Sequence, residues 1–227
     1  AGHGLPAVHP GLDRLRAEGR RLGFRAWRGD TELGEVTLEQ PGRHNAFNAL
    51  AAIAVGIELD LSFEQVAKGL NGFSGVDRRF SERARVNDVI VVDDYAHHPV
   101  EILATLGAAA EGYEDRRIVA VFQPHRYSRV ASLHEDFCRC FNHAAHVVVL
   151  PVYAAGEAPI EGATAESLVS GLVDHGHRGV TLVDSVEGAV AFLAGMVRPG
   201  DIVITLGAGD VNRACALLAD RLRGGGA

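Results

Sequence analysis

Lysine is almost absent from this sequence of 227 residues. Of its 22 basic side chains, only Lys68 is a lysine, and the rest are arginines. A reaction step that needs a lysine must therefore use Lys68 or a residue outside this chain. Acidic side chains outnumber basic ones, and the net charge is −7. There is no basic field to hold a nucleic-acid backbone or an anionic membrane surface, so we expect neither as a partner.

Long apolar runs and metal-type cysteine spacings are also missing. The longest apolar stretches, such as 144–152, are interrupted and fall far short of the ~20 residues of a membrane span. The three cysteines form no ligand motif, since Cys138 and Cys140 only flank an arginine in a predicted helix. No signal peptide is visible at the N-terminus. We therefore expect a reduced, cytoplasmic compartment.

The hydrophobic pattern from residue 86 onward predicts an α/β domain. Short β-branched runs alternate with segments of helical period, which favours a parallel sheet with helices on both faces. The predicted strands are 86–92, 117–123, 146–152, 179–183 and 201–206, and the predicted helices are 99–111, 128–142, 165–175, 186–197 and 211–222. Pro99 suits a first helical turn, and Ser185 and Asp210 suit N-caps.

The residues before about 77 follow a different pattern, of one hairpin and two helices. These elements are expected at 24–28, 32–38, 45–57 and 62–70. Gly29-Asp30 is the hairpin signal, and a capping box begins at Ser62. Such elements make a poor domain by themselves. We therefore predict that residues 1–77 are the end of a longer domain, and that residues 78–227 form a complete one.

The side chains expected to carry chemistry follow the predicted strands, because ligands of an open parallel sheet collect at its carboxyl edge. The three segments are Asp93-Asp94-Tyr95-Ala96-His97-His98-Pro99, Pro124-His125-Arg126-Tyr127-Ser128-Arg129 and Gly207-Ala208-Gly209-Asp210. The first two segments hold at least four ionisable groups each, which is more than solubility requires.

The first segment has two other interpretations. Asp93 and Asp94 could cap the following helix, although Pro99 already supplies a helix start. His97 and His98 could ligate a metal together with one of these carboxylates. No further His or Cys lies close by at a helical spacing, so we expect no metal site.

In the second segment, Arg126 and Arg129 lie at a predicted helix start, where positive charge opposes the helix dipole. Binding a carboxylate or phosphate explains their position, and a solvated helix face is the alternative. The last segment is not a dinucleotide fingerprint, because Asn212 stands at the third glycine position and the motif belongs after a first strand. We interpret it as a tight turn with a weak anion site.

Further candidates lie upstream. Asn45 and Asn48 share one face of a predicted helix beside His44, and asparagine is a poor helix-interior residue. This favours amide recognition or stacking, with plain capping by Asn45 as the alternative. Arg78 and Arg79 lie in the predicted hinge, 72–80, where they could reach a ligand between domains, or simply belong to a solvated linker.

Taken together, five motifs over about residues 21–222 resemble the Mur ligase family. They are Pro41-Gly42-Arg43-His44-Asn45, Gly75-x-x-Arg78-Arg79-Phe80, the segment 93–99, Phe122-Gln123-Pro124-His125-Arg126-Tyr127-Ser128-Arg129 and Leu206-Gly207-Ala208-Gly209-Asp210. The stretch 123–129 resembles the branch that joins L-alanine to UDP-N-acetylmuramate more than the branch that recycles murein tripeptide.

The resemblance implies an ATP-dependent ligase of peptidoglycan precursor synthesis, with a UDP-sugar domain, a central ATPase domain and a C-terminal Rossmann-like domain. ATP would phosphorylate the lactyl carboxylate of UDP-N-acetylmuramate, and the amine of L-alanine would attack the acyl phosphate. The implied nucleotide-binding residues are His44, Asn45, Asn48, Arg78, Arg79 and Asp94. The implied alanine pocket is formed by Tyr95, His97, His125, Arg126 and Arg129, of which His97, His125 and Arg126 are the predicted catalytic residues.

One family feature is missing. The family's phosphate loop ends in Gly-Lys-Ser/Thr, whereas Lys68 lies between Ala67 and Gly69 in a predicted helix. We therefore expect the phosphate loop, the UDP-sugar domain and the Mg²⁺ ligands outside this chain, and residues 1–77 to end the ATPase domain. By itself the chain should bind nucleotide weakly and turn over nothing. The alternatives are a tripeptide-recycling ligase and a stand-alone Rossmann-like module that binds an anionic metabolite.

Overall fold

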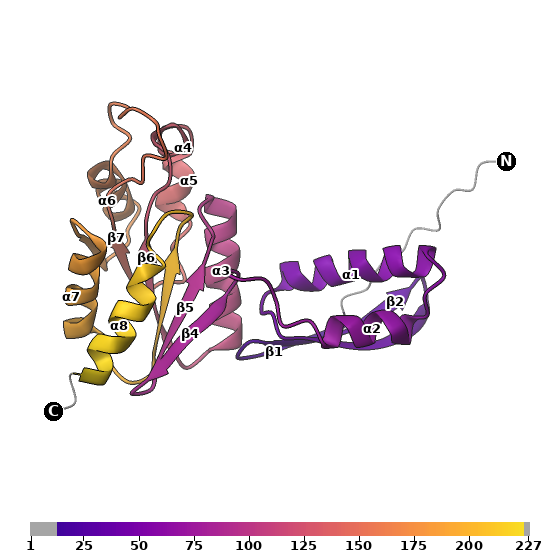
Figure 1. The fold of residues 1–227 in the computed structure, drawn as a ribbon. Coiled ribbons are helices and arrows are strands. Elements are labelled where there is room, and N and C mark those ends of the chain that lie inside the picture. Colours follow the sequence, from indigo (N-terminus) through magenta and orange to yellow (C-terminus); the bar gives the residue numbers. More distant parts are fainter. Residues whose placement is uncertain (1–12, 225–227) are drawn as a thin grey trace. The chain divides into compact units, whose positions relative to one another are not determined.

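The computed structural model describes residues 13–224, which form two compact units. One unit runs up to Gly75 and takes in Glu111–Tyr113; the other comprises Val76–Ala110 and the residues from Glu114 onward. The smaller unit contains a three-stranded sheet and the larger a six-stranded sheet (Figure 1). Each sheet supplies a core to its own unit.

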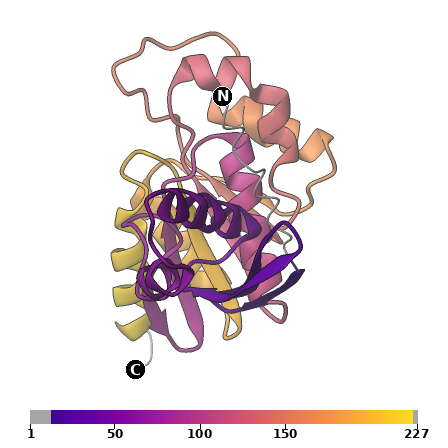
Figure 2. The same cartoon turned by 90° about the vertical axis from the view of Figure 1, so that its right-hand side faces the viewer.

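The smaller unit is an antiparallel sheet with two helices beside it (Figure 2). Its elements are β1 (Asp13–Glu18), β2 (Arg21–Arg28), β3 (Thr31–Leu38), α1 (Arg43–Glu58) and α2 (Phe63–Asn71). Every second residue at the start of β2 is buried, and these residues pack in one apolar core with α1. That core includes Leu22, Phe24, Ala26, Leu50 and Ile53. The predicted hairpin and both helices are confirmed, and β1 was not predicted.

Local signals shape this unit as expected. Gly29 opens the two-residue turn between β2 and β3 with φ 59°, a conformation that costs glycine little. The Ser62 Oγ accepts a hydrogen bond from the Gln65 N–H (3.3 Å), and Gln65 Oε1 accepts one from the Ser62 N–H (2.8 Å). This is the predicted capping box, and Lys68 lies inside the helix that it starts.

The larger unit is built on a six-stranded sheet in the order β4-β5-β9-β6-β7-β8. The strands are β4 (Ser81–Val86), β5 (Val89–Asp94), β6 (Arg117–Phe122), β7 (His146–Val149), β8 (Val180–Leu182) and β9 (Asp201–Leu206). β4 is antiparallel to β5, and all the other neighbouring pairs are parallel. The predicted α/β class is confirmed, with one antiparallel edge strand added.

That edge strand was missed because its sequence, Ser-Glu-Arg-Ala-Arg-Val, has no β-branched run. The first strand was expected at 86–92, but Val86 ends β4 and Val89 begins β5. Asn87 and Asp88 form the turn between them, and both have positive φ (51° and 59°). Two such residues fit the backbone of a type I′ hairpin turn.

Helices cover both faces of this sheet (Figure 1). They are α3 (Pro99–Gly112), α4 (Tyr127–Ser132), α5 (His134–Arg139), α6 (Ala165–Asp174), α7 (Val186–Met196) and α8 (Arg213–Gly224). Val119 and Val121 belong to the core that α7 and α8 cover. Phe122 faces the other way, and its ring lies 5.4 Å from that of Phe137 in α5. None of the helices described within 13–224 has both the length and the apolar character that crossing a membrane requires.

Two details of the predicted helices were wrong. The single helix expected at 128–142 is interrupted at Leu133, whose φ of −123° is not helical. Its hydrophobic period continues across the break, so the period alone could not reveal it. Asp210 is not an N-cap, because α8 begins only at Arg213 and the Asp210 carboxylate accepts a hydrogen bond from Gln123 Nε2 (2.8 Å). The Ser185 cap is confirmed.

An ion pair joins the amino-terminal ends of two neighbouring parallel strands, β6 and β9. Arg117 at the start of β6 donates through Nε (2.9 Å) and Nη2 (2.6 Å) to the two carboxylate oxygens of Asp201 at the start of β9. Asp201 is only 1% exposed. Removing one partner of such a pair leaves a charge without its counterpart, which is strongly destabilising.

We therefore predict that Asp201→Ala lowers the free energy of unfolding by about 3 kcal/mol. Urea denaturation followed by circular dichroism measures the change. The matched control is Asp220→Asn, which breaks an exposed pair with Arg223 on α8 and should change stability little. An Asp201→Ala variant as stable as this control would contradict the prediction.

Candidate functional site

Four loops meet at the carboxyl edge of the larger sheet, because they follow the neighbouring parallel strands β5, β9, β6 and β7. Three of these loops carry the residues predicted from the sequence. The fourth, after β7, was not considered in the sequence analysis. All four lie within one compact unit.

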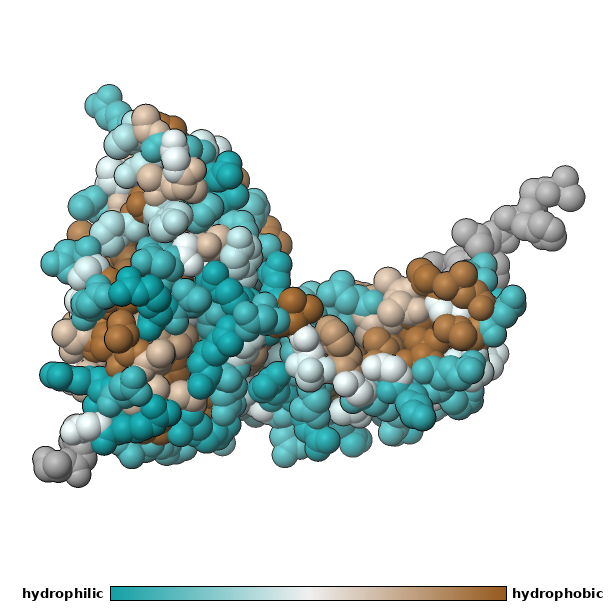
Figure 3. Space-filling view, viewed as in Figure 1, coloured by the Kyte–Doolittle hydropathy of each residue, from teal (hydrophilic) through white to brown (hydrophobic). Residues whose placement is uncertain are grey.

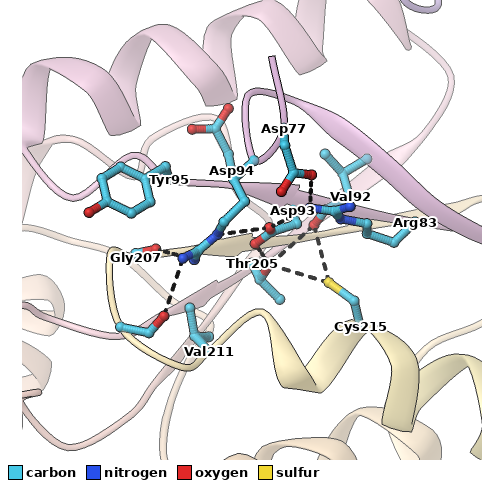
Figure 4. Close-up of polar contacts among 12 residues, drawn as sticks. Asp77, Arg83, Val92, Asp93, Asp94, Tyr95, Thr205, Gly207, Val211 and Cys215 are labelled. Atoms are coloured by element: carbon cyan, nitrogen blue, oxygen red, sulfur yellow. Dashed lines mark hydrogen bonds and ion pairs between the residues drawn. The ribbon is translucent and has the colours of Figure 1, made fainter. Parts of the chain in front are cut away.

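A buried carboxylate, that of Asp93, organises the base of this edge (Figure 4). Asp93 is fully buried, and its Oδ2 accepts hydrogen bonds from Arg78 Nε (3.1 Å) and Arg83 Nη2 (3.2 Å). Its Oδ1 accepts one from Thr205 Oγ1 (2.8 Å). A buried charge needs such partners, since burial removes its hydration. Asp93 is therefore held inside the fold.

Arg78 continues this network toward the glycine-rich loop after β9. Its Nη2 donates to the Gly207 carbonyl (2.7 Å) and its Nη1 to the Gly209 carbonyl (3.4 Å). The guanidinium also lies 4.9 Å from the ring centroid of Tyr95, within cation–π range. The guanidinium of Arg78 is thus occupied by contacts with other residues of the same unit. Arg79 is half exposed. Its Nη1 lies 3.9 Å from Glu101 Oε1, and its guanidinium lies 5.9 Å from the ring centroid of Tyr95.

Asp94 also points inward. Its Oδ2 accepts from the backbone N–H of Phe80 and its Oδ1 from that of Ala96, both at 2.8 Å. Burial raises the pKa of this carboxyl, while the two hydrogen bonds act in the opposite direction. Asp94 therefore joins the backbone just before β4, at Phe80, to that of the loop after β5, at Ala96. Of the three predicted nucleotide-binding residues in this unit, which are Arg78, Arg79 and Asp94, Arg79 has the most exposed side chain.

His97 is oriented by its own loop. Its Nδ1 lies 2.8 Å from the Tyr95 carbonyl oxygen, which can only accept, so Nδ1 is the donor of this hydrogen bond, and in the neutral form of the ring the lone pair is on Nε2. Glu101 Oε2 accepts from the backbone N–H groups of His97 (3.0 Å) and His98 (3.2 Å). Glu101, rather than Asp93 or Asp94, thus accepts from the two N–H groups that directly precede α3.

His125 faces His97 across the two loops, with ring centroids 5.8 Å apart. Its other side stacks on Tyr153, at 5.4 Å and an interplanar angle of 8°. Arg129 Nη1 donates to the His125 carbonyl (2.9 Å) and lies 3.3 Å from His125 Nδ1. Burial lowers the pKa of His125, and the charge of Arg129 lowers it further. The ring is therefore neutral at pH 7.

Arg126 presents its charge at this edge. Its side chain is 52% exposed, and Nη1 lies 3.9 Å from Glu157 Oε1 in the loop after β7. Tyr153 and Glu157 are the residues that the sequence analysis missed. The same carboxyl-edge rule, applied to the loop after the third predicted strand, would have singled them out.

The glycines after β9 allow close packing. A Cβ on Gly207 would lie 3.0 Å from the Gln123 carbonyl oxygen, and one on Gly209 would lie 2.8 Å from Cδ2 of Tyr153. Gln123 Oε1 also accepts from the backbone N–H of Val211 (3.2 Å). The glycine loop therefore lies directly against the loops after β6 and β7.

The remaining predicted residues belong to the smaller unit. His44, Asn45 and Asn48 lie in the first turns of α1, with His44 and Asn48 exposed. Asn45 is not the N-cap, which is Gly42. Asn45 Nδ2 donates to the Pro41 carbonyl (2.8 Å), and its Oδ1 lies 3.4 Å from Asn48 Nδ2. The two asparagines thus share a face, as predicted.

The metal-binding potential of the described residues is low. Within 13–224, no group of three or more His, Cys, Asp or Glu side chains could hold a metal ion. Cys138, Cys140 and Cys215 are buried and not in disulfides. Burial raises the pKa of each of these thiols, which makes them poor nucleophiles.

This chain is similar to known proteins in sequence and in fold. Residues 78–209, more than half of the chain, match the family described as "Mur ligase, glutamate ligase domain". The chain belongs to the Mur ligase family. A relative from Geobacter sp. (strain M21), named UDP-N-acetylmuramate–L-alanine ligase, is 49% identical over 197 residues, which are 87% of this chain and 43% of the relative. This Mur ligase chain thus spans less than half the length of the curated relatives that it matches.

Solved structures of Mur ligases agree in fold. UDP-N-acetylmuramate-alanine ligase from Thermotoga maritima superposes with a TM-score of 0.80 at 28% identity, over 94% of this chain and 46% of that one. A MurF ligase of the same organism, in complex with ADP, reaches a TM-score of 0.71 at 18% identity, over 94% and 46% of the two chains. The second similarity concerns the fold alone.

The pKa of His125 can be measured on this chain, and its environment predicts the direction of the shift. Its imidazole should titrate below the ordinary value of about 6.5, and Arg129→Met should raise its pKa because a nearby positive charge is removed. NMR titration of the ring resonances measures both. Arg139→Met, on the exposed surface of α5, is the control and should leave His125 unchanged. A wild-type value above about 6.5 would exclude the described environment.

Proposed function

We propose that this chain is the C-terminal part of an ATP-dependent ligase that joins L-alanine to UDP-N-acetylmuramate through an acyl phosphate. The observation that carries the proposal is the juxtaposition of His97, His125 and the half-exposed Arg126 at one sheet edge. It occurs in a chain that is 49% identical to a ligase of that name.

The chemistry explains why such groups are useful. A carboxylate is a poor electrophile, so ATP first converts the lactyl carboxylate to an acyl phosphate. The ammonium of L-alanine must lose a proton, and the free amine then attacks the acyl carbon. The C–N bond forms as the C–O bond to the phosphate breaks, and inorganic phosphate leaves. His97 would accept that proton, because in the neutral form of its ring Nε2 has a lone pair. Arg126 and Arg129 would bind the alanine carboxylate or the charge that develops on the reacting groups.

For the nucleotide, we propose the residues that the family resemblance implies. His44, Asn45 and Asn48 would lie around the adenine, and Arg79 near the ribose and phosphates. Arg78 and Asp94, assigned to the same role from the sequence, would act there through the backbone that they hold. We propose that the Mg²⁺ ligands lie in the rest of the ligase, together with the phosphate loop.

The smaller unit supports the proposal that more of an ATPase domain belongs beside it. Apolar side chains are exposed over its helices (Figure 3). Val55 in α1 is 60% exposed, and Leu59, which directly follows α1, is 69% exposed. A shallow groove between α1 and α2 has a volume of about 550 Å³ and is lined mainly by apolar residues such as Val66 and Leu70. Surfaces of this kind usually mark an interface. We propose that residues 1–77 end the central domain.

We also propose a cytoplasmic location, because the co-substrate would be ATP and the three cysteines are unpaired. Neither nucleic acid nor a membrane is a proposed partner, given the net charge of −7. UDP-N-acetylmuramate, L-alanine and ATP are the proposed substrates.

Expression of the full reading frame that contains this sequence tests the function. With UDP-N-acetylmuramate and ATP, we expect phosphate release that depends on L-alanine. The 227-residue chain alone should release none, because it lacks a Gly-Lys-Ser/Thr loop. Preference for the murein tripeptide would favour the recycling ligase. A frame that starts near Ala1 would favour a stand-alone binding module, and alanine-dependent turnover by the chain alone would disprove the fragment proposal.

A second prediction concerns Arg126. In the full-length protein, Arg126→Ala should cost about 1–3 kcal/mol in kcat/KM for L-alanine, since charged hydrogen bonds are lost. Steady-state kinetics with varied L-alanine measures it. Arg221→Ala in α8, a helix on one face of the sheet, is the control and should leave kcat/KM unchanged. Unaltered kinetics of the Arg126 variant would remove this residue from the pocket.

A further inference from the structure

The turn that carries Arg126 is held in an unfavourable conformation. Arg126 has φ 71°, in the left-handed region that residues with a Cβ rarely adopt. Such a conformation persists where the surroundings fix it, and it is common at functional sites. Two residues of the loop after β7, Tyr153 and Glu157, hold this turn.

Tyr153 holds the backbone on both sides of the turn. The Arg126 N–H donates to the Tyr153 carbonyl (2.9 Å), and the Tyr153 N–H donates to the Pro124 carbonyl (2.8 Å). These bonds make a short parallel bridge between His125 and Tyr153. The Tyr153 ring also stacks on His125. The first half of the turn is thus attached to the loop after β7.

Glu157 holds the second half. Its Oε2 accepts from the backbone N–H of Ser128 (2.9 Å) and its Oε1 from the Ser128 hydroxyl (2.7 Å). Oε1 also lies 3.9 Å from Arg126 Nη1. One carboxylate therefore binds the backbone, the hydroxyl and the guanidinium of the same turn. The two Ser128 hydrogen bonds lower the pKa of Glu157, which keeps it ionised at neutral pH.

We propose that Glu157 is a positioning residue for the ligase reaction, which holds the turn at Ser128 and orients the Arg126 guanidinium for binding the carboxylate of the incoming amino acid. This inference rests on the proposed function. Glu157 acts through Arg126 and Ser128 and does not contact the substrate. Losing it should therefore weaken the use of L-alanine and leave the use of ATP unaffected.

The experiment compares Glu157→Gln with Glu161→Gln in the full-length protein. Glu161 lies in the same loop, is exposed and loses the same charge. We expect Glu157→Gln to raise the KM for L-alanine roughly tenfold, with the KM for ATP unchanged. Ser128→Ala, which removes only the hydroxyl partner, should shift the same constant less. Amide hydrogen exchange on the 227-residue chain should be faster at Ser128 in Glu157→Gln and unchanged in Glu161→Gln.

The outcomes separate the two claims. Without alanine-dependent turnover in the wild type, the proposed function fails, whatever the variants do. If the wild type is active and Glu157→Gln behaves like Glu161→Gln, the positioning role is overturned and the function stands. An equal rise in the KM for L-alanine and ATP would indicate a general structural role and would also overturn the inference. A selective loss at L-alanine with faster exchange at Ser128 supports it.

Discussion

The neutralisation of one buried carboxylate, Asp93, underlies the architecture of the candidate site. The end of β5 is buried, so a charge there has no water to solvate it. Arg78 and Arg83 supply the compensating charge, and Thr205 on β9 supplies a hydroxyl donor. Because Arg78 also binds the carbonyl oxygens of the glycine loop, the same guanidinium connects two of the four loops at the carboxyl edge.

The polar residues at the carboxyl edge of the sheet fall into two groups. Asp93, Asp94 and Arg78 point inward and satisfy buried or backbone partners. Arg79 and Arg126 remain half exposed, with ion-pair distances of 3.9 Å that leave their guanidinium groups available for an anion. The inward residues fix the loops, and the outward residues carry the exposed charge that the proposed ligand site would use. A site of this type combines rigidity with accessible charge.

The elements that were predicted correctly are those whose signal is local. Strands such as β6 and β9 are β-branched runs, and the capping box at Ser62 needs only a few residues. The errors arose where pairing or packing decides. β4 is a charged edge strand that is stabilised by pairing with β5, and the helix break at Leu133 leaves the hydrophobic period intact. The pairing that forms β4 and the break at Leu133 are both invisible to a hydrophobic pattern that is read one element at a time.

The sequence alone determined which chemistry is present and at which sheet edge it gathers, because parallel strands carry their loops at a common edge. It also identified the histidines and arginines of that edge by residue type. The tertiary structure decided which of them point inward, since that depends on buried partners such as Asp93 and the Gly207 carbonyl. It also introduced Tyr153 and Glu157, whose contacts with the turn at Arg126 join segments about 30 residues apart, because β7 lies next to β6.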